Sequence, residues 1–275
     1  MRKCIFLKEF MKYLKQIPLS LLAPFLISIF VFGCSRKKVE APPQYPDWVT
    51  YSYKHFVFHY PKDCFWGKKM DEFSTSYERF LSEDCSFLGI EIPIDTIHFY
   101  IHNNSEEGQK LTGRLLPFHT VNQIHWDRRT PWGLELARYL TDKMDIRMTD
   151  FRFLYDGLVT LLDYSGNDYH HSTISLIEFK RFISIDSLIN NESYARADSL
   201  NREWEAASVV GFITYNFGIN RFKMLWQSAA SFEESTNELF GVDLKKFESG
   251  WLIFAHKYYQ GIKTETIFTD STAHK

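Results

Sequence analysis

The sequence predicts an α+β fold in which a small amino-terminal sheet precedes a mostly helical part. Segments of alternating apolar residues are confined to positions 52–126, and helical periodicity dominates beyond residue 130. The 275 residues, 45% of them hydrophobic, are enough to bury a core. A charged fraction of 24% and a formal net charge of −2 exclude a disordered chain and a strongly basic nucleic-acid binder.

Residues 1–33 have the features of an export signal. A basic start precedes an apolar run from Ile17 to Phe32. The following Gly33-Cys34 pair resembles the lipobox of bacterial lipoproteins, although Phe32 stands where a small residue is usual. We therefore expect cleavage before Cys34 and a lipid on its thiol that holds the protein on a membrane. An uncleaved membrane anchor is the alternative.

The other boundaries follow from composition. Residues 34–48 contain prolines and a charge cluster, which predict a tether. The folded domain is expected over 49–260 and a carboxy-terminal tail over 261–275. Translation from Met11 instead of Met1 would leave a shorter signal of the same kind. The expected location is the bacterial cell envelope, on the outer membrane and facing the periplasm.

The elements before residue 130 are read from their periodicity. Alternation of apolar residues predicts strands, whereas a spacing of three to four predicts a helix. Two acidic residues after Ser105 suit the start of a short helix. The expected strands are 52–60, 95–102 and an extended segment at 114–126, and the longer helix is 69–88.

Beyond residue 130 the pattern predicts helices almost throughout. Gly218 and Gly241 are expected to end helices because glycine favours the left-handed conformation found there. The expected helices are 131–145, 151–165, 172–189, 193–218 with one break, 219–230, 232–240 and 243–258.

A polar stripe on the helix at 131–145 singles out the candidate site. Glu135, Arg138 and Asp142 follow one another at i, i+3 and i+7, and so lie on one side of the helix. Apolar residues occupy the opposite side. On the next helix, Asp156 projects away from a leucine stripe.

This segment resembles the gluzincin zinc metallopeptidases, in particular the peptidase-MA-like group. That group carries His-Glu-x-x-His on one helix and a Glu-Gly ligand on the next. Histidines at i and i+4 share a helix face and bind the metal, and the glutamate activates water. Here the corresponding positions are Leu134, Glu135, Leu136, Ala137 and Arg138, followed by Asp156 and Gly157.

The resemblance covers most of residues 50–258. Residues 56–61 and 97–102 are similar to the family's first two strands, and residues 240–251 are similar to its closing helix. The resemblance implies a zincin-like (gluzincin) bundle after the small sheet. Fold analogy alone does not establish an activity.

The family's histidine ligands are both replaced. Its general base is kept as Glu135, but Leu134 has no donor atom and Arg138 puts a fixed positive charge where a dication would sit. Glu135 and Asp156 alone are too few ligands for tight zinc binding, so we expect vestigial positions, no metal and no cofactor. We expect the Arg138 guanidinium to pair with Glu135, Asp156 or both. The alternative is an ordinary solvated helix face.

These residues favour a lipoprotein with a catalytically degenerate peptidase-like domain that binds a peptide, glycan or protein partner. The expected site is a groove between helices 131–145 and 151–165. Its candidate aromatic walls are Trp132, Tyr139, Tyr155 and Trp204, although residues of this kind more often belong to the core.

Two other functions stay open. One is an active hydrolase that takes a metal through Glu135, Asp156 and a histidine of the 164–171 loop. The other is a purely structural envelope component. Otherwise His170 and His171 are expected on a surface loop.

Overall fold

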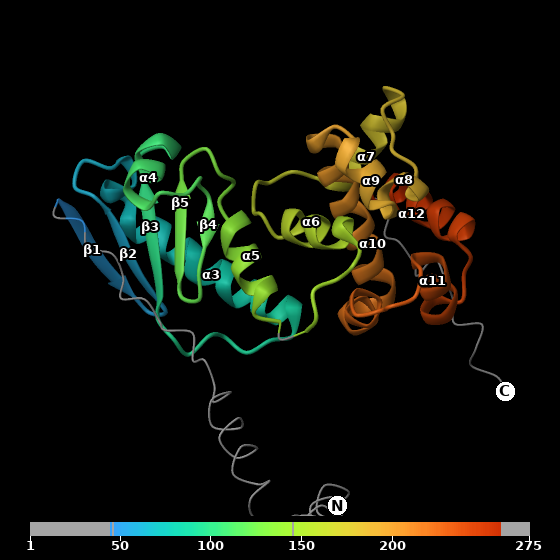
Figure 1. Cartoon of the computed structure of the whole chain (residues 1–275), viewed down its shortest axis with the longest axis horizontal. Helices are drawn as coiled ribbons and strands as arrows, with labels where there is room; N and C mark the ends of the chain where they lie inside the picture. The colour runs from blue at the N-terminus through green and yellow to red at the C-terminus, as the bar shows by residue number, and fades with distance from the viewer. Residues whose placement is uncertain (1–44, 46, 145, 260–275) are drawn as a thin grey trace, which may run out of the picture. The chain divides into compact units, whose positions relative to one another are not determined.

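The structure is a computed structural model that describes residues 45, 47–144 and 146–259 (Figure 1). The predicted signal over 1–33, the lipidation at Cys34, most of the tether and the tail over 261–275 lie outside the described residues. Within the described part, no helix combines the length and apolarity needed to cross a membrane.

Five strands form one mixed sheet near the amino-terminal side of the described chain. The strand order is β1-β2-β3-β5-β4. The central pairs β2/β3 and β3/β5 are parallel, and the two outer pairs are antiparallel. The bounds are β1 (Trp48–Tyr53), β2 (Phe56–Pro61), β3 (Ile97–His102), β4 (Phe118–His119) and β5 (Gln123–Asp127). This confirms the small sheet and the mixed fold class.

The expected single strand at 52–60 is wrong, because a hairpin divides it. Lys54 adopts a left-handed conformation (φ 47°), and the chain reverses there between β1 and β2. Alternation continues on both sides of the turn and hides it. The segment at 114–126 is likewise a hairpin, with a turn closed by the Thr120 amide on the Gln123 carbonyl (2.8 Å).

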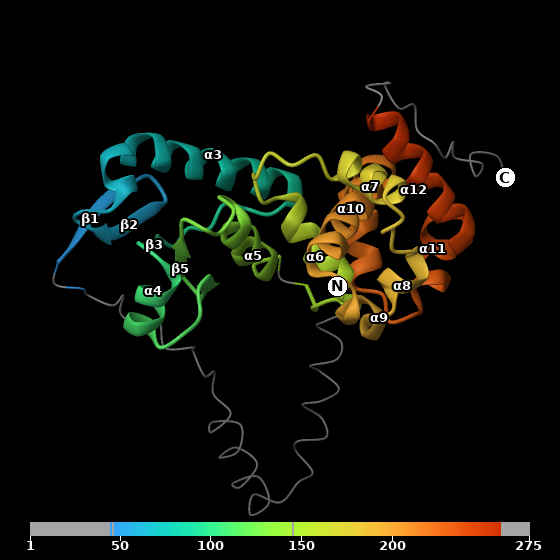
Figure 2. The same ribbon diagram turned by 90° about the horizontal axis from the view of Figure 1, so that it is seen from above.

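Two helices cover opposite faces of the sheet (Figure 2). The long helix α3 (Met70–Leu88) follows a short 3-10 helix, η1 (Phe65–Lys69), and α4 (Ser105–Thr112) lies on the other side. The face toward α3 is apolar: Phe58 of β2 and Phe99 of β3 surround Phe73 and Tyr77 of α3. β2 therefore buries every second residue, as the period predicts, whereas β3, a central strand, is buried on both faces over most of its length.

The opposite face carries a stack of aromatic rings across four strands. His59, Tyr100, His125 and Phe118 follow one another with ring centroids 4.4–4.5 Å apart and nearly parallel planes. Burial lowers the pKa of His59 to about 4 and that of His125 to about 3. These histidines are neutral near pH 7 and act as packing groups.

The rest of the described chain is helical and is organised around α10, which contacts α6, α7, α11 and α12. Figure 1 shows α10 between these neighbours. The bounds are α5 (Leu134–Asp142), α6 (Arg152–Leu161), α7 (Tyr169–Glu178), α8 (Ile185–Ile189), α9 (Asn191–Arg196), α10 (Ser199–Trp226), α11 (Phe232–Phe240) and α12 (Leu244–Tyr259).

Several expected helices have different limits. Those at 131–145 and 151–165 are shorter in the structure, as α5 and α6, and the one at 193–218 corresponds to parts of α9 and α10. The segment 172–189 contains most of α7 and all of α8, separated by a loop. The buried Glu205 accepts from the Ile183 amide, and the half-buried Glu248 accepts from the Ile185 amide. The segment 219–230 continues α10 beyond a kink at Gly218 (φ 81°, ψ 160°). Gly241 ends α11 in a left-handed conformation, as expected.

The crossing of α6 and α10 depends on Gly157. A Cβ atom at this position would lie 2.5 Å from the Ala206 carbonyl oxygen and 2.9 Å from a Val210 methyl group. Backbone cannot move aside as a flexible side chain can. Glycine is therefore required for the two helices to approach this closely.

Candidate functional site

Glu135 lies in the first turn of α5 and is 2% exposed. Its Oε1 is 2.6 Å from Nδ1 of His119, a residue of β4. Its Oε2 accepts a hydrogen bond from the Arg138 guanidinium at 3.0 Å. Both oxygens of the carboxylate that resembles a general base are therefore engaged.

His119 links this carboxylate to a second one. Its Nε2 lies 3.0 Å from Oδ2 of Asp142, at the far end of α5. Ionised carboxylates only accept hydrogen bonds, so both ring nitrogens carry protons and the imidazole is charged. Burial lowers the pKa of His119, but its bonds to Glu135 and Asp142 outweigh that effect and raise the pKa overall. The network thus contains two cations, His119 and Arg138, and two anions, Glu135 and Asp142.

The expected pairing of Arg138 is found at Glu135. Asp156, the other candidate partner, instead lies 3.4 Å from Nε of Arg152 within α6. Glu135 and Asp156 therefore pair with different arginines. The alternative of a wholly solvated face on α5 does not fit a Glu135 side chain that is almost completely buried.

The residues at the positions that resemble the zinc motif do not fit a zinc ion. Leu134 packs against the hydrophobic core, Arg138 is a cation, and Glu135 has no oxygen without a hydrogen-bond partner. In the part of the chain that the structure describes, no three His, Cys, Asp or Glu residues are grouped to hold a metal ion. The side chains here form a network of ion pairs and not a set of metal ligands.

Two candidate wall residues belong to the core. Tyr139 is buried, and Trp132, just before α5, packs against the core with the Trp66 ring 4.9 Å away. Tyr155 and Trp204 are half-buried.

Sequence reasoning missed His119 as a site residue. Only the pairing of β4 with β5 and the packing of β4 against α5 bring it to Glu135. The sequence does show a histidine in the extended segment at 114–126, before the polar stripe of Glu135, Arg138 and Asp142. Nothing in the local pattern distinguishes this histidine from His125, which lies in the same segment.

The expectation for His170 is wrong. It lies on α7, not on a loop, and it is 8% exposed, whereas His171 faces outward. Its Nδ1 lies 2.9 Å from the Ser208 hydroxyl, which also receives a hydrogen bond from the Trp251 indole. The hydrogen-bond partner of His170 is thus on α10, and among the described residues His170 is not grouped with Glu135 and Asp156 as a possible metal site. Burial lowers the pKa of His170 to about 4.

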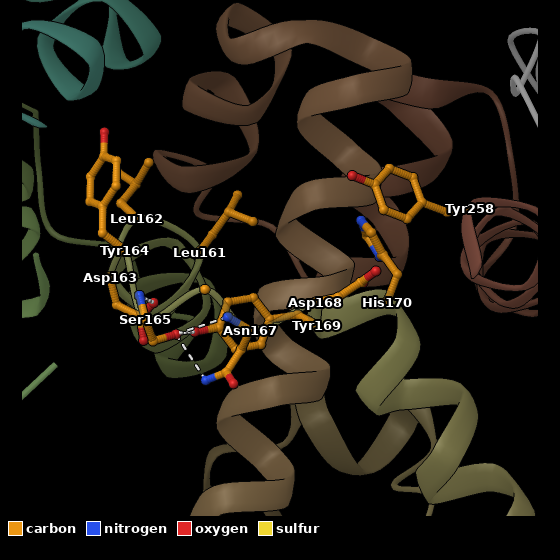
Figure 3. A pocket seen from close by; sticks show the side chains of 11 residues that line it. Leu161, Leu162, Asp163, Tyr164, Ser165, Asn167, Asp168, Tyr169, His170 and Tyr258 are labelled. Carbon is orange, nitrogen blue, oxygen red and sulfur yellow. Dashed lines mark hydrogen bonds between the residues drawn. The ribbon is translucent and has the colours of Figure 1, made fainter. Parts of the chain in front are cut away.

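A pocket of about 450 Å³ lies where α6 ends and α7 begins. Figure 3 shows Tyr164 and Leu162 at one end and Tyr258 with His170 at the other, with a polar group of side chains between them. In that group, Ser165 Oγ lies 2.9 Å from the Tyr169 hydroxyl and accepts from the Asn167 amide. The volume is within the range of small-molecule sites.

The loop that forms this pocket holds a strained residue. Tyr164 has φ 49°, a conformation that side chains with a Cβ rarely adopt. Its hydroxyl lies within hydrogen-bond distance of Glu83 and Asp84 of α3, and its ring stacks on Phe80 at 3.8 Å. These contacts fix the loop against α3, so the pocket has a preformed wall.

Comparison with known proteins gives no assignment. No protein-family model matches the chain, and no curated protein matches it. Any function must therefore be argued from the residues themselves.

Proposed function

We propose that this protein is a lipid-anchored component of a bacterial envelope whose gluzincin-like domain binds a ligand and does not hydrolyse one. The observation that carries the proposal is the engagement of Glu135 by His119 and Arg138. A catalytic glutamate needs an oxygen free to accept a proton from water. Here each oxygen already faces a cation.

The kinship with gluzincins is supported by the order of motifs along the chain. The later motif residues now have packing roles: Trp251 donates to Ser208, and Glu248 holds the Ile185 amide. The lipid anchor is supported by the Gly33-Cys34 sequence alone. Mass spectrometry of the membrane fraction tests it, and an unmodified Cys34 would contradict it.

The first experiment measures zinc in the full chain purified without chelators, together with thermal unfolding before and after zinc is added. We expect no stoichiometric zinc and no stabilisation. A metal that binds the folded state and is present at about 100 times its Kd would stabilise it by about 2.7 kcal/mol, so the absence of a shift is informative. Stoichiometric zinc with chelator-sensitive hydrolysis would overturn the proposal in favour of the active hydrolase.

A gain-of-site variant tests the kinship. The double substitution Leu134→His with Arg138→His gives the His-Glu-x-x-His spacing around Glu135. The two histidines would then be the first two metal ligands, and Asp156 would be the third. We expect this variant to bind zinc and to be stabilised by it. The single variant Arg138→His is the matched control and should respond weakly. A folded double variant with no zinc response would contradict the gluzincin relationship.

A further inference from the structure

We infer that the pocket between the end of α6 and the start of α7 binds a neutral sugar ring. The inference rests on the proposed binding role and names its ligand class. It depends on three features of the lining. These are a histidine that donates a hydrogen bond, several acceptors on the neighbouring loop, and an aromatic side chain in a lining that has no lysine or arginine.

The donor is His170. An indole nitrogen can only donate, so Ser208 accepts from Trp251. Among the described residues, Nδ1 of His170 is the acceptor found for the Ser208 proton, and the hydroxyl therefore donates to it. The neutral imidazole therefore carries its hydrogen on Nε2. No hydrogen-bond partner of Nε2 is found among the residues that the structure describes, although the side chain is more than nine-tenths buried and lines the pocket. Because Nε2 is not one of the fully buried atoms that lack a partner, it opens onto the pocket, where a ligand acceptor can receive its hydrogen bond.

The acceptors come from the loop and the helix start. Asp168 uses Oδ1 to accept from the His171 amide at 2.9 Å, and Asp163 uses Oδ1 to accept from the Ser165 amide at 2.9 Å. Asp168 has a second oxygen, whereas the Asp163 carboxylate also interacts with the Tyr169 hydroxyl. Asn167 donates to Ser165 through its nitrogen, which leaves the amide oxygen as an acceptor. Ligand hydroxyl groups can donate to these atoms and accept from His170.

Charge and shape exclude other classes of ligand. The lining contains two aspartates but neither lysine nor arginine, so an anion would be repelled. An ammonium group itself has no acceptor for the His170 donor, whereas every sugar hydroxyl can both donate and accept. Tyr258 is 48% exposed and stands edge-on to His170, with ring centroids 4.7 Å apart. An exposed tyrosine face suits the apolar side of a sugar ring.

The test is titration of the full chain in detergent micelles, followed by calorimetry and saturation-transfer NMR. The probes are glucose, N-acetylglucosamine and its disaccharide, with choline and inorganic phosphate as charged comparisons. We expect a sugar to bind with a Kd in the micromolar to millimolar range, about −8 to −4 kcal/mol. Neither choline nor phosphate should bind.

Three variants locate the binding. Tyr258→Ala should weaken it about tenfold or more, a loss of about 1.4 kcal/mol. Tyr215→Ala removes an exposed tyrosine of α10 outside the pocket lining and should leave it unchanged. Asp168→Asn keeps an oxygen to cap α7 and removes the charge, so a neutral ligand should lose only a few-fold in affinity.

Each other outcome overturns the assignment. It fails if the sugars do not bind at about 10 mM, if Tyr258→Ala has no effect, or if choline binds instead and is lost in Asp168→Asn. Failure of the proposed function is distinguishable, because it appears as bound zinc and chelator-sensitive hydrolysis. Absence of both sugar binding and zinc would remove only the sugar assignment.

Discussion

Glu135 and Glu205 are both almost completely buried, yet their surroundings are opposite. Glu135 lies between a histidine and an arginine. Glu205 faces the Ile183 amide with both oxygens and has no ion-pair partner among the described residues. Desolvation raises the pKa of Glu205 to about 8, and the hydrogen bond from Ile183 lowers it only in part.

This difference separates two uses of a buried acid. A buried carboxyl group without a cation has a raised pKa, so it is mostly protonated and uncharged near pH 7, and it serves as a hydrogen-bond acceptor for a loop. A carboxylate between two cations forms a charged network that joins a strand to a helix. Neither arrangement leaves an oxygen free for catalysis, although the Glu135 segment resembles a catalytic motif.

The largest effect is expected from His119→Ala. Removing this residue leaves Glu135 buried with one cation and Asp142 with none, which costs about 3 kcal/mol. The matched control is His55→Ala, because His55 lies at the same 2.6 Å from Glu78 but is 38% exposed. The control should lose less than about 1 kcal/mol. Equal losses in urea unfolding would break the distinction between the two environments.

Glu205→Gln is expected to change the pH dependence of stability. The folded-state pKa of about 8 exceeds the ordinary 4.5, so the folded chain binds this proton more tightly than the unfolded chain. The stability contribution is complete below about pH 4.5 and is lost as the pH rises to about 8. The free energy of unfolding of the unsubstituted protein should therefore fall by a few kcal/mol between these pH values, and this fall should be absent in the variant. Urea unfolding at both ends checks it, and an unchanged slope would refute it.

A pH effect close in size to that of Glu205 concerns Asp84, a third buried acid, because its pKa shift is nearly as large. Desolvation raises its pKa to about 7, while the hydrogen bond from Tyr164 opposes the shift. Because the ordinary value is 3.8, its contribution is lost as the pH rises from about 4 to about 7. Asp84→Asn should flatten this part of the stability profile by slightly less than Glu205→Gln does. A larger change for Asp84→Asn would show that the hydrogen bond from Tyr164 does not offset the desolvation of Asp84.

A smaller effect is expected when two arginines are compared. Arg138→Met removes one of the two cations at a buried acid and should cost about 2 kcal/mol. Arg152→Met removes the cation beside the partly exposed Asp156 and should cost about 0.5 kcal/mol or less. Thermal unfolding of both variants measures the difference. If Arg152→Met were the more damaging, the central role of Arg138 would be excluded.

Long periodic helices were predictable from the sequence, and long-range contacts were not. The expected helix at 69–88 matches α3 within one residue, because its apolar positions repeat over several turns. The stripe of Glu135 and Arg138 was also visible as a helix face. The contribution of His119 was not visible, because it depends on strand pairing. His170 was misplaced because two adjacent polar histidines after Asp168 suggested a loop, whereas Asp168 caps α7.

Gly157 suggests how such a chain changes over evolutionary time. Its lack of a side chain is required by the α6–α10 crossing, whatever residues stand at positions 134 and 138. Selection for folding alone is therefore enough to preserve this glycine. Under the proposed kinship with gluzincins, the Asp156-Gly157 pair would persist through helix packing and not through metal binding.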